Sequence, residues 1–134
     1  MQKEKMTNKE LADLLQGLFS VQDLKGVKFA LTVAKNIRLV ESELKSIQEA
    51  VKPSNDFLEL SNKVMALEEK KDAAGIKKLE AENKELISER KKQLAELEEL
   101  MKEESEVSLF TMPESKLPSE ITGKQINSIF KIIK

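Results

Sequence analysis

The chain of 134 residues contains no cysteine, histidine, tryptophan or tyrosine, and five phenylalanines are its only aromatic side chains. Without cysteine there is no disulfide framework, no thiolate nucleophile and no cysteine-based zinc site. Without histidine the commonest general base and transition-metal ligand are missing. These absences exclude most enzyme templates, so we predict a non-enzymatic protein that uses no metal and no cofactor.

Long apolar runs and charge of one sign are scarce as well. No run approaches the roughly eighteen apolar residues of a membrane span, and no signal-peptide pattern is present. The 23 basic and 24 acidic residues give a net charge of −1, and stacking aromatics are few, so neither a membrane nor a nucleic acid is the expected partner. The expected location is the cytoplasm.

The middle of the chain is predicted to be helical. From Leu24 to Val51, apolar residues recur at alternating spacings of four and three, as in the seam of a coiled coil. Pro53 then breaks or kinks the helix, and Asp72–Gly75 is the expected hairpin tip, because glycine can end a helix in the left-handed conformation. A returning helix is predicted over residues 76–104.

Two residues in the returning helix, Asn83 and Arg90, fall near the apolar seam. Polar residues at a seam can fix the register of two paired helices at a cost in stability. Alternatively, the predicted helical hairpin is partly open to water at these positions. The sequence leaves both interpretations open.

The two ends of the chain predict a small packed head. Thr7-x-x-Glu10 and Thr122-x-x-Gln125 have capping-box spacing and predict helices over 8–19 and from 122 onwards, the latter with Ile126, Ile129, Phe130 and Ile133 on one face. A strand at 2–6 is expected to pair with one at 106–111. The predicted fold is therefore mainly α: a long antiparallel, coiled-coil-like hairpin (24–104) on a small α/β head formed by residues 1–23 and 105–134.

One stretch, Leu24 to Val40, holds four cations and no acid. Cations near a helix N-terminus oppose the macrodipole, at a cost of about 0.3–1 kcal/mol each. Their presence here therefore indicates a role in addition to folding. The candidate binding residues are Lys28, Lys35, Asn36 and Arg38, which would cradle a phosphate or an acidic partner surface. The alternative is that these side chains pair with the acidic returning helix, Glu89 to Glu104.

Self-association or a partner helix is also expected, because two antiparallel helices bury only one stripe each. Four apolar residues lie beside the stripes and are available for contacts with other chains: Leu39, Leu58, Ile87 and Leu100.

Motifs near both ends, and two in the middle, resemble a family of small tailed-phage and prophage proteins. They are Leu11, Leu14 and Leu18; Val27–Ala30; Ala34–Leu39; Lys52–Ser54; Phe57–Glu59; Glu106–Leu109; and Leu117–Thr122 with Gln125. The chain departs from the family pattern at Asp72–Gly75, where a longer insertion is expected. The resemblance implies a phage-derived protein in the bacterial cytoplasm or in virion assembly, and it carries no catalytic residues.

Three functions are compatible with these observations. The first is binding of a host or phage protein, in phage development or in interference with a host system. The second is an oligomeric sponge that sequesters an anionic nucleotide signal. The third is a structural component of the virion or its assembly.

Overall fold

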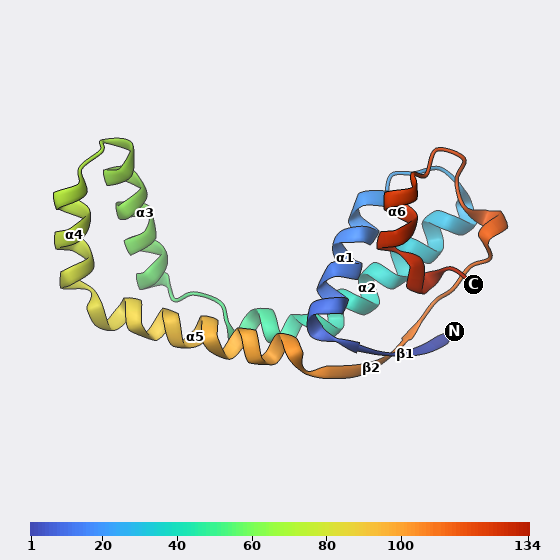
Figure 1. Ribbon diagram of the computed structural model, residues 1–134, viewed down its shortest axis with the longest axis horizontal. Helices are drawn as coiled ribbons and strands as arrows, with labels where there is room; N and C mark the ends of the chain where they lie inside the picture. The colour runs from blue at the N-terminus through green and yellow to red at the C-terminus, as the bar shows by residue number, and fades with distance from the viewer. The chain divides into compact units, whose positions relative to one another are not determined.

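The computed structural model describes all residues 1–134 and divides them into two compact units. One unit consists of residues 1–47 and 100–134, and the other of residues 48–99. We call the first unit the head and the second the arm, and describe each by itself. Both are built mainly from helices (Figure 1), which confirms the predicted mainly α fold.

The head joins the two ends of the chain through a pair of strands. β1 (Gln2–Thr7) runs antiparallel to β2 (Glu104–Leu109), with Gln2 opposite Leu109 and Thr7 opposite Glu104. The prediction of this pairing is confirmed, although β2 begins and ends about two residues earlier than expected. Around the strands lie α1 (Asn8–Val21), most of α2 (Val27–Ala50), α6 (Gly123–Ser128) and two short 3₁₀ turns, Glu114–Lys116 and Phe130–Ile132.

Both predicted capping boxes are present. The Glu10 amide donates to the Thr7 hydroxyl at 3.1 Å, and the Thr7 amide donates to the Glu10 carboxylate at 3.0 Å. The same reciprocal pair joins Thr122 and Gln125, at 3.2 and 3.0 Å. Each box satisfies two amides that a helix start leaves without an intrahelical partner. Sequence spacing alone therefore located the starts of α1 and α6.

The glycine in the last turns of α1 has a packing role. A Cβ atom built on Gly17 would lie 2.6 Å from the backbone oxygen of Ser128. Only a residue without a side chain permits α1 and α6 to approach this closely. Gly17 thus joins two helices that are distant in sequence, and α1 continues past it to Val21.

The core of the head includes α2, which the sequence assigned to the arm. Phe29, Val33 and Val40 are almost entirely buried, and they belong to one cluster with side chains of α1, β2 and the C-terminal segment. The expected head of residues 1–23 and 105–134 therefore differs from the observed unit, which extends through residue 47. The spacing predicted the helix correctly, but its apolar face packs into the head and does not form the expected hairpin seam.

The C-terminal helix is shorter than its pattern suggested. α6 ends at Ser128 and is followed by a 3₁₀ turn, which changes the rotation per residue. Phe130, expected on the buried face, is 65% exposed, whereas Ile132 is fully buried in its place. The chain end is held by the Met112 amide, which donates to Ile132 O at 3.0 Å.

The arm begins after a break in the helix. Residues 51–54 are not helical, so Pro53 separates α2 from α3 (Asn55–Glu69), and the Ser54 hydroxyl caps α3 by accepting from the Phe57 amide at 3.2 Å. α3 and α4 (Ala73–Glu82) form a helical hairpin around the expected tip (Figure 1). The left-handed residue in this turn is Lys71, with φ of 58°, rather than Gly75. Gly75 lies in the first turn of α4, where its amide donates to the capping carboxylate of Asp72 at 2.9 Å.

The single returning helix expected over residues 76–104 is divided into α4 and α5 (Lys84–Lys102). Asn83 separates them with φ of −121° and ψ of 31°, and its side-chain amide donates to Leu79 O at 2.8 Å. Asparagine favours such local bonds to the backbone over a continued helix. The polar residue near the predicted seam thus ends a helix.

Candidate functional site

The exposed face of α2 carries most of the residues singled out from the sequence. Lys28, Lys35 and Arg38 are exposed, while Phe29, Val33 and Asn36 of the same helix are buried. Two apolar side chains share the outer face with the cations: Val27 is 89% exposed and Leu31 is 50% exposed. We call this surface the basic stripe; it consists of Val27, Lys28, Leu31, Lys35 and Arg38.

Asn36, the fourth predicted binding residue, does not belong to this surface. Its side chain is fully buried and its Nδ2 donates to Thr32 O at 3.0 Å and to Phe110 O at 2.8 Å. Its Oδ1 accepts from the Phe110 amide at 2.9 Å. Because Phe110 follows the last paired residue of β2, Asn36 replaces the strand partner that Phe110 lacks. Asn36 therefore fastens the end of β2 to α2, and its buried side-chain amide has no donor left for a ligand.

Lys35 is anchored near the same point. Its Nζ lies 5.3 Å from the centroid of the Phe110 ring, a geometry in which an ammonium group is attracted to the ring face. The ring holds one cation of the basic stripe beside the end of β2. The hydrogen bonds of Asn36 and this ring contact both meet at Phe110, a connection that sequence spacing could not indicate.

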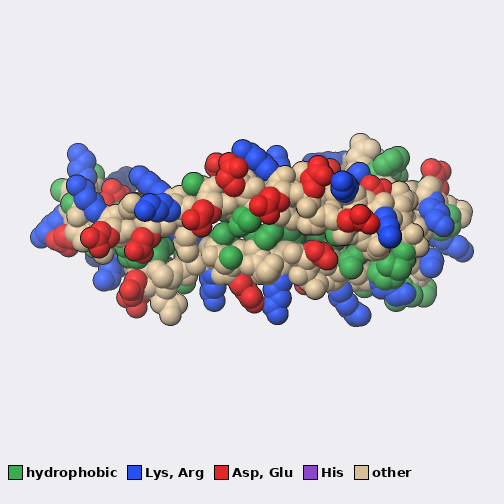
Figure 2. Space-filling model, turned by 90° about the horizontal axis from the view of Figure 1, so that it is seen from below, with side chains coloured by type: hydrophobic (Ala, Val, Ile, Leu, Met, Phe, Trp, Pro, Cys, Tyr) green, Lys and Arg blue, Asp and Glu red, His purple; other side chains and the backbone are tan.

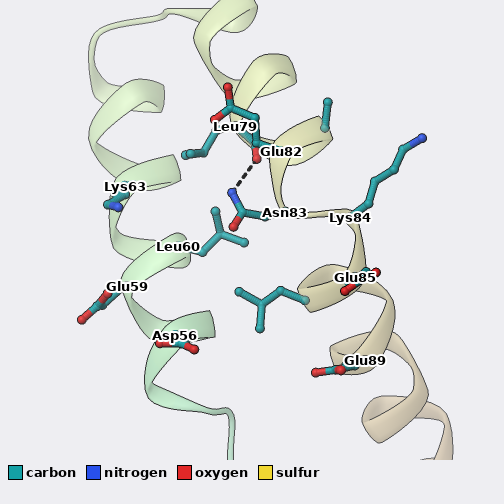
Figure 3. A pocket seen from close by; sticks show the side chains of 12 residues that line it. Asp56, Glu59, Leu60, Lys63, Leu79, Glu82, Asn83, Lys84, Glu85 and Glu89 are labelled. Atoms are coloured by element: carbon teal, nitrogen blue, oxygen red, sulfur yellow. Dashed lines mark hydrogen bonds between the residues drawn. The ribbon is translucent and has the colours of Figure 1, made fainter.

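The arm offers a second candidate surface, an open pocket of about 630 Å³ (Figure 3). Leucines from all three arm helices line it: Leu60 from α3, Leu79 from α4 and Leu86 from α5. In Figure 3, Leu60 points toward the α4–α5 junction at Asn83. The charged and polar residues that line the pocket are Asp56, Glu59, Lys63, Glu82, Asn83, Lys84, Glu85 and Glu89. We call this surface the acidic pocket, since five of these residues are carboxylates and two are lysines.

A neighbouring depression of about 420 Å³ has the opposite charge. Lys77, Lys84 and Lys91 recur every seven residues and line it together with Ile87 and Glu80. The remaining lining residues are Ala81 and Ser88. We call this surface the lysine ridge, after the three exposed lysine side chains that border the depression. It adjoins the acidic pocket, because Ala81 and Lys84 line both.

Arg90 has a structural role in the arm that the sequence did not reveal. Its Nη1 donates to Val51 O at 2.6 Å and to Gln93 Oε1 at 3.1 Å. Its guanidinium carbon lies 5.8 Å from the Phe57 ring centroid. The Val51 carbonyl has no helical partner because the helix breaks before Pro53. Arg90 donates a hydrogen bond to this carbonyl in place of the missing partner. Its position near the seam was the only sequence signal.

The pKa of the Glu10 carboxyl lies below its ordinary value, chiefly because the Thr7 backbone amide donates a hydrogen bond to it. No group of three or more acidic side chains is arranged to hold a metal ion. Over the face shown in Figure 2, acidic and basic side chains are interspersed, with apolar side chains visible between them.

Comparison with known proteins adds no relative: no family model, no curated protein and no solved structure matches this chain. Among the helices, none combines the length and the apolar character needed to cross a membrane. The function of the chain is therefore inferred from its own three surfaces: the basic stripe, the acidic pocket and the lysine ridge.

Proposed function

We propose that the protein is a non-enzymatic binding protein and that the basic stripe of α2 docks an acidic surface of a partner protein. The observation that carries this proposal is the exposure of Val27 and Leu31, at 89% and 50%, on a helix whose opposite face is fully buried. Covering an apolar side chain supplies about 1.5–3 kcal/mol when burial is complete. The stripe therefore offers affinity in addition to charge.

The charges of the stripe favour an acidic partner. Lys28, Lys35 and Arg38 are exposed within a segment that contains no acid from Leu24 to Val40. Cationic patches speed encounter with acidic surfaces and discriminate against basic ones. Lys28 lies in the first turn of α2, where the macrodipole opposes a cation, so its presence is better explained by a partner than by the stability of the helix.

A protein accounts for the stripe better than a small anion does. A nucleotide would engage the cations and leave Val27 and Leu31 exposed, whereas a protein surface covers all five residues. The buried amide of Asn36 also removes one of the four groups that a nucleotide cradle was expected to use. The resemblance of the sequence to tailed-phage and prophage proteins supports a partner from the phage or its bacterial host.

The test is photo-crosslinking of the full chain in phage-infected bacteria, with the photoreactive residue at position 31. We expect one predominant acidic protein to be crosslinked, and the crosslink to be lost at high salt and in Arg38→Glu. The matched control for charge reversal is Lys9→Glu, an exposed position on α1 outside the stripe. Equal crosslinking in both variants contradicts the proposal.

Purified protein provides the second arm of the test. Leu31→Glu should abolish binding of the captured partner, whereas Gln16→Glu, which adds the same charge at an exposed position of α1, should retain it. A thermal shift with a cyclic dinucleotide that disappears in Arg38→Glu would instead establish the nucleotide sponge and overturn the proposal of a protein partner.

A further inference from the structure

We infer that two copies of the chain associate through their arms, with the exposed lysine side chains of the lysine ridge of each copy extending into the acidic pocket of the other. This goes beyond the proposed function, which uses α2 of the head. Three features of residues 48–99 support this dimer. The apolar side chains are incompletely buried, the acidic pocket and the lysine ridge are complementary in charge, and both surfaces lie at the same helix junction.

The arm does not bury its own apolar side chains. Of the apolar residues among 48–99, only Leu60 is buried. Leu58, Met65 and Leu94 are 42%, 57% and 44% exposed. A larger group is half-buried: Val51, Phe57, Val64, Leu67, Ile76, Leu79, Leu86, Ile87 and Leu97. Helices this short derive their stability from packing of the apolar face, which a single copy leaves incomplete.

The two surfaces of the arm are complementary in charge. The acidic pocket has five carboxylates against two lysines, whereas the lysine ridge has three lysines against one carboxylate. Each also has an apolar centre, which is the leucine floor in the pocket and Ile87 in the ridge. A second copy therefore supplies the cations that the pocket lacks and an apolar side chain for its floor.

The geometry excludes closure of these surfaces within one arm. Ala81 and Lys84 line both depressions, so the two surfaces flank the same α4–α5 junction and cannot fold onto each other. Lys84 and Lys91 are separated by about 10 Å along α5 at 1.5 Å per residue.

A two-fold dimer is the arrangement that uses both surfaces fully. Since each copy carries one acidic pocket and one lysine ridge side by side, a two-fold axis creates the same contact twice. Association then covers Leu79, Leu86 and Ile87, which are half-buried in one copy. The polar rim surrounds this apolar centre, as is usual in protein interfaces.

Sedimentation velocity of the full chain over a range of concentrations tests the inference. We expect a monomer–dimer equilibrium whose Kd rises at least about tenfold between low and high salt, since screening weakens contacts between charged rims. A monomer at every concentration, or a dimer indifferent to salt, would overturn the inference.

Charge exchange gives the decisive comparison. Lys77→Glu with Lys91→Glu makes both surfaces acidic, and Glu82→Lys with Glu89→Lys makes both basic; all four positions are exposed, so the helices are retained. Each double variant alone should be monomeric, and an equimolar mixture of the two should form a heterodimer. Two monomers that fail to combine would refute the proposed contact.

Two controls separate this result from general effects. Lys70→Glu with Lys78→Glu reverses two exposed charges of the arm that line neither surface, and should dimerise like the unmodified chain. Leu31→Glu on the basic stripe should also dimerise normally. Loss of partner binding with an intact dimer would therefore refute only the proposed function, and loss of the dimer with intact partner binding only this inference.

Discussion

Replacing Asn36 by alanine is the sharpest test of how the head is held together. The amide of Asn36 satisfies both the N–H and the C=O of Phe110, at 2.9 and 2.8 Å. Each buried backbone group left without a partner costs about 1–3 kcal/mol. Because Phe110 is half-buried and water reaches part of this site, we expect Asn36→Ala to lower the free energy of unfolding of the head by about 2–4 kcal/mol. That loss is a large fraction of the roughly 5–15 kcal/mol typical of a domain.

Hydrogen exchange of the buried α1 amides measures this loss without interference from the arm, whose helices also contribute to the circular dichroism signal. A loss of about 2–4 kcal/mol accelerates exchange of the Leu11 and Leu18 amides roughly 30- to 1000-fold, where exchange requires global opening of the head. The matched control is Lys35→Ala on the same helix, which removes an exposed cation and its ring contact. We expect the control to change stability by less than about 1 kcal/mol.

Two outcomes would refute this reasoning. Exchange in Asn36→Ala that matches the Lys35→Ala control would show that the Phe110 backbone finds other partners at no cost. Unchanged stability together with lost partner binding would return Asn36 to the binding surface, where the sequence had placed it. The second outcome would also show that the basic stripe does not consist of cations and apolar residues only.

Three further perturbations follow from the geometry of the chain. Gly17→Ala should lower the thermal midpoint in a melting experiment by the equivalent of about 1–3 kcal/mol, because its Cβ would lie 2.6 Å from Ser128 O. Lys71→Gly should raise the free energy of unfolding of the arm by up to about 1 kcal/mol in urea titration, since φ of 58° strains a residue with a side chain. The pKa of Glu10 is lowered below 4.5, chiefly by the Thr7 amide, so its contribution to stability is complete above that pH and is lost as the pH falls through the folded-state pKa. Glu10→Gln should flatten the acid limb of the stability–pH profile, and an unchanged limb would contradict the role of the capping box.

The sequence predicted most where the determining interactions are local. Both capping boxes, at Thr7 and Thr122, connect residues three apart, and both form as their spacing requires. The break at Pro53 is likewise local, because proline removes a donor and restricts the residue before it. The strand pairing was predicted from the strand-like composition of residues 106–111 together with the expectation that the N-terminal segment 2–6 pairs with it to close a small head.

The sequence predicted least where a residue acts through a distant partner. Asn36 was grouped with Lys35 and Arg38 because they are close in sequence, yet its amide bonds to Phe110, seventy-four positions away. The role of Gly17 likewise depends on its contact with Ser128, which the local pattern does not show. In both cases the tertiary contact determines what the residue does.

The difference between head and arm follows from the same distinction. Apolar spacing along α2 and along α3 is alike, and both patterns predicted an amphipathic helix. In the head the apolar face of α2 meets α1, β2 and the C-terminal segment, and Val33 and Val40 are buried. In the arm the face of α3 meets only two short helices, and Val64 stays half-exposed. Apolar periodicity indicates that one face of a helix is to be buried, but it does not indicate which element or chain buries it. We therefore expect a second chain to cover the apolar residues that the arm leaves exposed, and the proposed dimer does so with two surfaces that this chain already contains.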